Sequence, residues 1–188
     1  CWLKENLNVG TMISGGSEME DNQIIEKYCY NNDPVNCDDY GGLYQWDEVM
    51  QYQNEPGVQG ICPGGWHIPT DDEWNILEGA ADSYYGVGDS TWNGTTYRGH
   101  DAGLNLKSAT GWNNNANGTD LTGFKATPGG IRLNPDLFNG LLFRGYWWTS
   151  NENSSSEAWR HYLAFNLDGA GRSAYLKTCG KSVRCIKD

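Results

Sequence analysis

The amino-acid sequence predicts an α+β fold stapled by disulfides. Two helical patterns lie in the first half of the chain, and a two-residue alternation of side chains occupies its end. Helices followed by an antiparallel run of strands favour the α+β class. Six cysteines without a Cys-x-x-Cys pair favour disulfides over a zinc site. The length suits one domain, which we expect to span residues 1–188.

The first helix is expected between Gly41-Gly42 and Pro56-Gly57. Leu43, Trp46 and Met50 recur there at helical spacing and would share one buried face. Because the flanking glycines and proline disfavour helix, they bound a helix of about ten residues.

The second helix begins with a capping box. Thr70 takes the N-cap position and Glu73 the third helical position, so the hydroxyl and the carboxylate each bond a backbone N–H that would otherwise be unpaired. Trp74, Leu77 and Ala81 then form the buried stripe of this helix.

The rest of the chain divides into a loop region and a sheet. Residues 83–140 are mostly Gly, Asn, Thr and Asp, and a long ordered loop of this kind often forms a functional surface. Residues 158–165 alternate with a period of two and predict a strand, residues 166–169 a turn, and residues 172–177 the partner strand. Residues 182–187 predict a final strand.

The charge limits the classes of partner. A net charge of −11 without any Lys/Arg cluster repels nucleic acid and anionic membranes. The chain contains no apolar run of about 18 residues, so we expect no membrane insertion in this fragment. Because the chain opens inside a motif at Cys1, we expect it to be a mature or trimmed fragment.

Six motifs run in order from one end of the chain to the other. They are WLKENLN at residues 2–8, YCYNN at 28–32, GGLYQW at 41–46, GICPGGWHIPT at 60–70, YWWTS at 146–150 and SVRCIKD at 182–188. Together they resemble the Fibrobacter succinogenes major paralogous domain family. The resemblance implies a bacterial surface or secreted protein, and some family members carry a pilin-like N-terminal segment.

Three of these landmarks look like a second, more distant group. IPTxxEW at residues 68–74, WWTS at 147–150 and VRC at 183–185 are similar to motifs of the formylglycine-generating enzyme family. This resemblance implies a C-type-lectin-like fold. In that fold two helices pack on a small twisted antiparallel sheet, the termini are neighbours and a long loop region follows.

The resemblance also implies a disulfide pairing. Cys62 would pair with Cys185 and Cys29 with Cys37, which leaves Cys1 with Cys179. A local Cys179–Cys185 bridge is the alternative and would force a different partner on Cys62. The cysteine count alone does not choose among the pairings.

The enzymatic landmarks of the distant group are missing. Its calcium-site acid falls at Trp147, and its catalytic cysteine pair has no matching motif here. His67, His100 and His161 do not lie in a triad signature, and the chain has no nucleophile elbow or phosphate loop. We therefore expect no enzyme, with an oxidase of the formylglycine-generating type or another enzyme as the alternative.

A calcium loop is the one metal hypothesis. Asn113, Asn115, Asn117 and Asp120 place side-chain oxygens in a short Gly-containing stretch, as the start of a calcium loop does. Phe124 stands where such a loop carries its closing Glu, so a solvated Asn-rich turn is the favoured interpretation. No other cofactor is expected.

The candidate ligand site follows from the distant resemblance, which places a ligand face on the long loop region and its neighbouring strands. Residues 110–120 and 150–175 match that location. Aromatic, amide and charged side chains there could stack on and hydrogen-bond a ligand, and of the aromatic residues we expect Trp148 and Trp159 to be core. The candidates are Trp112, Asn113, Asn151, Glu152, Trp159, Arg160, Tyr162 and Arg172.

The sequence thus predicts a non-enzymatic extracellular module of a bacterial surface, secreted or pilus-associated protein. It would act in adhesion by binding a glycan or a protein. A structural subunit of a surface assembly, which contacts only its neighbours, is a further alternative to the enzymes named above.

Overall fold

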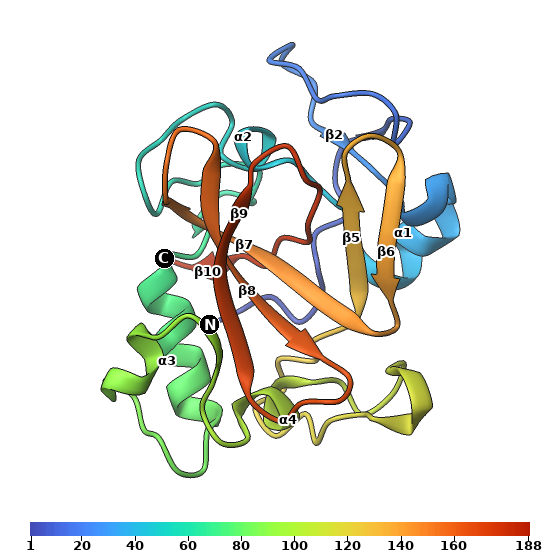
Figure 1. The fold of residues 1–188 in the computed structure, drawn as a ribbon. Coiled ribbons are helices and arrows are strands. Elements are labelled where there is room, and N and C mark those ends of the chain that lie inside the picture. The colour runs from blue at the N-terminus through green and yellow to red at the C-terminus, as the bar shows by residue number, and fades with distance from the viewer.

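The computed structural model describes residues 1–188 and confirms the α+β class (Figure 1). A six-stranded sheet runs in the order β4-β9-β8-β7-β5-β6, and two further sheets have two strands each. The strands are β1 Thr11–Met12, β2 Glu26–Lys27, β3 Trp66–His67, β4 Thr96–Arg98, β5 Gly129–Leu133, β6 Leu137–Leu141, β7 Arg144–Glu152, β8 Glu157–Ala164, β9 Ala170–Leu176 and β10 Ile186–Lys187. The helices are α1 Pro34–Tyr40, α2 Trp46–Val49, α3 Asp71–Ala81 and α4 Ala102–Leu106, with short 3-10 turns at Tyr30–Asn32, Ser90–Asn93 and Asn113–Asn115.

The main sheet is mixed, which corrects the expectation of an antiparallel sheet. Strands β7, β8 and β9 form an antiparallel meander, as the alternation over residues 158–177 predicts. Strand β5 pairs with β7 in parallel, through Gly130 and Gly145, and with β6 in an antiparallel hairpin. Residues 83–140 are therefore not one loop, because they also hold β4, α4 and this hairpin.

The chain has four α-helices rather than two. Helix α3 begins as predicted, because the side chain of Thr70 accepts from the backbone of Glu73 and the side chain of Glu73 accepts from the backbone of Thr70. Helix α1 was not expected from the sequence. Asp33 caps its N-terminus and Pro34 occupies its first turn, both of which favour a helix start.

The expected helix around Leu43–Met50 is much shorter than predicted. Leu43 pairs with Tyr28 and Tyr44 with Lys181 in isolated β-bridges, so the backbone is extended until Trp46. Leu43, Trp46 and Met50 are all buried, as their spacing predicts, but long-range pairing overrides the helical pattern at the first of them.

The two ends of the chain lie side by side (Figure 1). Trp2 forms a bridge with Ile186, and the amide of Lys187 donates to the carbonyl of Cys1 at 2.8 Å. Of the predicted final strand only β10 is a strand, and it pairs with β3.

Two of the three predicted disulfides are confirmed, Cys29–Cys37 and Cys62–Cys185. The second closes a loop with a sequence separation of 123 and stabilises the fold by about 5 kcal/mol on the loop-entropy model. The pairing of Cys1 with Cys179 is wrong, because both are free. Cys1 is exposed beside the C-terminus, whereas Cys179 is buried in a cluster with Ile131 and Tyr146.

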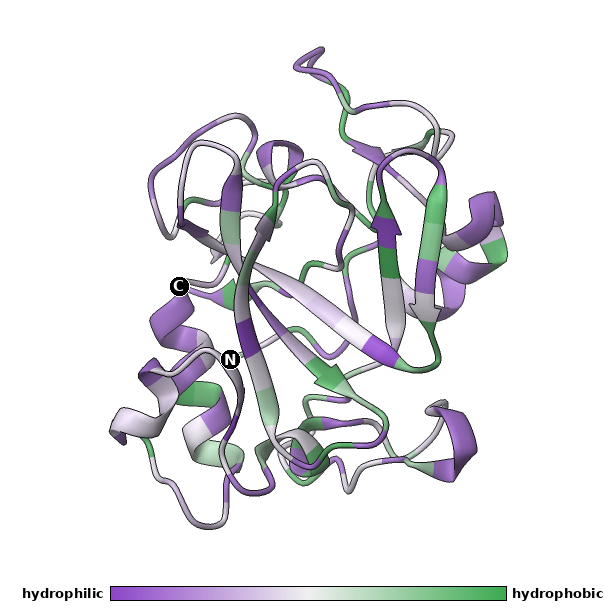
Figure 2. Cartoon of the chain, viewed as in Figure 1, coloured by the Kyte–Doolittle hydropathy of each residue, from purple (hydrophilic) through white to green (hydrophobic).

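Two aromatic cores flank the main sheet. Trp147 and Trp148 are neighbours on β7 and point to opposite faces, and both side chains are fully buried. Trp147 packs with Trp74 of α3, and Trp148 packs with Trp46 of α2. Figure 2 shows hydrophilic bands along the central strands, and β8 and β9 include charged residues. None of the four α-helices has the length and the apolar composition of a membrane-spanning helix.

Candidate functional site

The predicted ligand residues on β8 and β9 do not form one surface. Paired residues on neighbouring strands share a face, and successive residues alternate. Trp159 and Arg172 lie on the face that α3 covers, which we call the helix side. Arg160 and Tyr162 lie on the opposite face together with Tyr146, which we call the tyrosine side.

Of the other predicted ligand residues, Trp112, Asn151 and Glu152 make contacts that hold the fold together. Trp112 is a core residue whose ring nitrogen donates to Ser108 and Ala126. The side-chain oxygen of Asn151 accepts from the backbone of Asp71 at the start of α3, 2.8 Å away. Glu152 pairs with Lys177, and Asn113 lies in the 3-10 turn after Trp112.

The predicted calcium ligands are partly engaged within their own loop. Asn117 accepts from the backbone of Trp112 at 3.0 Å, and Asp120 accepts from the backbone of Lys125 at 2.7 Å. Asn113 and Asn115 lie in one 3-10 turn. No group of three or more His, Cys, Asp or Glu side chains is placed to hold a metal ion. Calcium at this loop stays a prediction for calorimetric titration.

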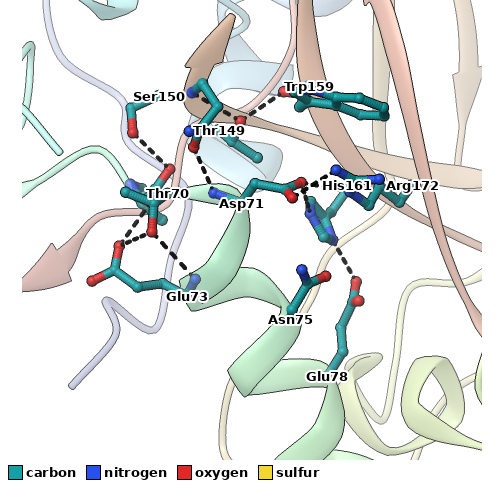
Figure 3. A network of polar contacts seen from close by, with 12 residues as sticks. Thr70, Asp71, Glu73, Asn75, Glu78, Thr149, Ser150, Trp159, His161 and Arg172 are labelled. Atoms are coloured by element: carbon teal, nitrogen blue, oxygen red, sulfur yellow. Dashed lines mark hydrogen bonds and ion pairs between the residues drawn. The ribbon is translucent and has the colours of Figure 1, made fainter. Parts of the chain in front are cut away.

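The helix side carries a continuous network of charges (Figure 3). Arg172 donates to both carboxylate oxygens of Asp71, each at 2.7 Å, and its guanidinium lies 3.7 Å from the Trp159 ring centroid. Nε2 of His161 lies 3.1 Å from Asp71 Oδ1. Burial alone would raise the pKa of the Asp71 carboxyl, but the hydrogen bonds with His161 and Arg172 outweigh it and hold the pKa well below its usual range.

The network continues inward to a second carboxylate. Nδ1 of His161 lies 2.7 Å from Oε1 of Glu78, and Glu78 also pairs with Arg98. The side chains of His161, Glu78 and Arg98 are almost wholly buried. Because every charge here faces an opposite charge inside the protein, this cluster is built to join α3 to the sheet rather than to bind a ligand.

The tyrosine side holds an arginine enclosed by rings. The Arg160 guanidinium carbon lies 3.8 Å from the ring centroid of Tyr175, 4.6 Å from that of Tyr146 and 5.2 Å from that of Tyr162. Its Nε donates to Ser173 Oγ at 3.2 Å. Cation–π contacts and this hydrogen bond fix the side chain in one orientation.

Arg160 has no acidic partner. No carboxylate lies within salt-bridge distance of it, and its two terminal nitrogens make no hydrogen bond to the protein. Neither nitrogen is among the polar atoms that are sealed from water without a partner, so both keep contact with solvent. Arg160 therefore presents the four N–H donors of its two terminal nitrogens, and nothing in the chain accepts them.

A second unpaired base lies beneath this cluster. Lys181 is fully buried, and its Nζ has no hydrogen-bond partner. Nζ lies 3.3 Å from the Trp148 ring centroid and 4.6 Å from that of Tyr175. Burial, and then the charge of Arg160, lower the pKa of Lys181 well below its usual value. The tyrosine side thus holds two basic side chains, one beneath the other, and neither forms an ion pair with an acidic residue.

Sequence reasoning found Arg160 and Tyr162 but missed Tyr146, Tyr175 and the role of Ser173. The alternation within β8 is visible in the sequence, whereas the register between strands is not. Only the pairing of Tyr146 with Tyr162, and of Arg160 with Ser173, brings these side chains together.

The comparisons with known proteins bear on the family alone. The model of the Fibrobacter succinogenes major domain matches residues 1–187. A comparison with curated proteins and a comparison with solved structures each found no match. The match includes all six motifs described above, apart from the last residue of the sixth. The chain therefore belongs to the Fibrobacter succinogenes major domain family.

Proposed function

We propose that this chain is a non-enzymatic ligand-binding or adhesion module of a bacterial surface, secreted or pilus-associated protein. In this proposal its fold is C-type-lectin-like, and its ligand is a glycan or protein that presents a carboxylate to Arg160. The two disulfides indicate an oxidising location outside the cytoplasm, which supports the extracellular part of the proposal.

The unpaired guanidinium of Arg160 is the observation that carries the proposal. A guanidinium fork matches the two oxygens of a carboxylate, and such charge-assisted pairs are about twice as strong as neutral hydrogen bonds. In a chain of net charge −11, a fixed arginine without an acidic neighbour is unexpected on structural grounds. The rings around it offer apolar surface for the rest of the ligand.

An oxidase related to the formylglycine-generating enzymes is the rival that the free cysteines favour. The thiol of Cys179 is enclosed with Ile131 and Tyr146, where a substrate has no access, and Cys1 lies beside the other end of the chain. These positions give more support to binding than to thiol chemistry. A purely structural subunit would have no need for the unpaired donors of Arg160.

A titration with galacturonate, a monosaccharide carboxylate, tests the proposal. The Nε–H signal of Arg160 and the ring signals of Tyr146 and Tyr175 should shift and saturate in NMR spectra, and galactose should shift neither. Arg160→Gln should abolish the response. Arg172→Lys, on the helix side, is the matched control and should keep it.

Two results would overturn the proposal. One is the absence of any galacturonate response in the wild-type protein at millimolar concentration. The other is an unchanged response in Arg160→Gln, provided that near-ultraviolet circular dichroism shows a native fold. Either result would mean that the tyrosine rings around Arg160 serve only to pack the protein interior.

A further inference from the structure

The tyrosine side carries a second unpaired arginine. Arg144 is exposed at the start of β7 and forms no ion pair, and its Nη1 lies 3.2 Å from the hydroxyl of Tyr146. Arg160 lies over the ring of that same tyrosine. One tyrosine side chain therefore separates two guanidinium groups, of which one is fixed by rings and the other is reached from solvent.

The surroundings of these two arginines contain no acid. The strongest electrostatic neighbours of Arg144 are Tyr146, Tyr97 and Tyr162, and those of Arg160 are tyrosines and Cys179. Tyr97 and Tyr162 in turn have only tyrosines and arginines as their strongest electrostatic neighbours. This face is positive on an otherwise acidic chain, so it attracts negative charge selectively.

A groove with aromatic walls continues from Arg144. It has a volume of about 350 Å³ and is lined by Asn139, Gly140, Phe143, Arg144 and Phe165. Phe143 is 43% exposed, and its ring meets that of Phe165 edge to face with centroids 5.3 Å apart. On the other side of Tyr162, Tyr97 is 37% exposed and makes a similar edge contact with it at 5.1 Å. Aromatic surface thus flanks the two arginines.

The position of the site favours a polysaccharide over a peptide. A peptide that binds along a sheet gains main-chain hydrogen bonds at an exposed edge. Strands β7, β8 and β9 are interior strands, and their main-chain groups are paired within the sheet. A ligand on this face therefore cannot form hydrogen bonds with the main chain. It must accept hydrogen bonds from side chains and pack on aromatic surface.

We infer that the ligand is a linear acidic polysaccharide with a carboxylate on successive sugar units, one bound by Arg160 and a neighbouring one by Arg144. Sugar rings pack on Phe143 and Tyr97 at either side. The inference rests on the proposed function, because Arg160 holds the first carboxylate in both. It adds the length and the repeating charge of the ligand.

Oligogalacturonides of one to six units test the inference by calorimetry. Affinity should rise at least tenfold from the monomer to the hexamer, because the longer chain adds a charge-assisted pair with Arg144 and aromatic contact. Arg144→Gln should remove most of that gain. A fully methyl-esterified hexamer, which has lost its charges, should bind at least tenfold more weakly than the free acid.

The outcomes separate the two proposals. A monomer that binds through Arg160 without any gain for the hexamer would overturn the inference and leave the proposed function standing. Hexaglutamate binding as tightly as the hexagalacturonide would also overturn it, because charge alone would then decide. Failure of every galacturonate, the monomer included, would remove both proposals.

Discussion

The two faces of the central sheet treat charge in opposite ways. On the helix side the carboxylates of Asp71 and Glu78 are each paired, Asp71 with Arg172 and Glu78 with Arg98, and the ring of His161 joins the two pairs. On the tyrosine side Arg144, Arg160 and Lys181 form no ion pair, and the contacts of their charged ends are with aromatic rings and hydroxyl groups. The same three strands carry both arrangements, so the difference arises from the neighbours and not from the scaffold.

This contrast distinguishes charged side chains that are paired inside the protein from those that remain free to bind a ligand. A buried ion pair is satisfied inside the protein, and removing one partner leaves the other unpaired at a high cost. An arginine that is fixed but unpaired has donors left for a ligand. Abundant polar residues are therefore weak evidence for a site until their partners are counted. His161, beside two carboxylates, resembles catalytic geometry but is fully paired.

The largest effect is expected on the helix side. Glu78→Gln keeps the shape of the side chain but removes the charge between Arg98 and His161. We expect a loss of about 3–5 kcal/mol in the free energy of unfolding, measured by urea denaturation. Asp72→Asn, on the exposed surface of the same helix, is the control and should change it by no more than about 1 kcal/mol. Equal effects of the two variants would mean that the buried network is not structural.

The opposite sign is expected beneath the tyrosine side. Lys181→Met fills a similar volume and removes a buried amino group without a hydrogen-bond partner. We expect the free energy of unfolding to rise by about 1–3 kcal/mol at pH 7. Lys177→Met, which breaks the pair with Glu152, should lower it instead.

The increase in the free energy of unfolding expected for Lys181→Met should depend on pH, because the pKa of Lys181 is lowered. Between that pKa and about 10.5 the unfolded chain holds a proton that the folded chain lacks, so wild-type stability rises with pH through this residue. The advantage of Lys181→Met should therefore shrink as pH rises from 7 toward 10. A constant advantage would show that the lysine is charged in the fold, and galacturonate binding should persist in the variant throughout.

The same contrast marks what the sequence could and could not predict. The capping box at Thr70 is a short local motif, and the Cys62–Cys185 bridge is implied by the family resemblance; both are confirmed. The helix expected at Leu43 fails because Tyr44 pairs with Lys181, far away along the chain. Long-range pairing of this kind leaves no local signal.

Only part of the candidate site could be predicted from the sequence, because local patterns are visible there and long-range pairing is not. The alternation over residues 158–165 already places Trp159 and Arg160 on opposite faces, so the mixed list of ligand residues could have been divided. Which face keeps its charges unpaired depends on α3 and on the register with β7 and β9. The predicted Cys1–Cys179 disulfide is wrong for the same reason. The two ends of the chain are neighbours, but the side chain of Cys179 packs with Ile131 and Tyr146, away from Cys1.

The smallest effect is expected for a pair open to water, which tests whether burial rather than pairing sets the contrast. His67 lies 2.7 Å from Asp188 and 3.0 Å from Glu73 at the edge of the fold. Burial alone would lower the pKa of His67, but hydrogen bonds with Asp188 and Glu73 outweigh it and raise the pKa above its usual value.

The stabilisation by His67 is therefore full below about pH 6.5 and is lost as pH rises through the raised pKa. Its size should stay below about 1 kcal/mol, because both carboxylates are partly hydrated. Urea unfolding of wild type and His67→Gln from pH 5 to pH 9 measures it, and the difference between them should narrow with rising pH. A difference as large as that of Glu78→Gln would mean that pairing alone, without burial, decides what a charge contributes on either face of the sheet.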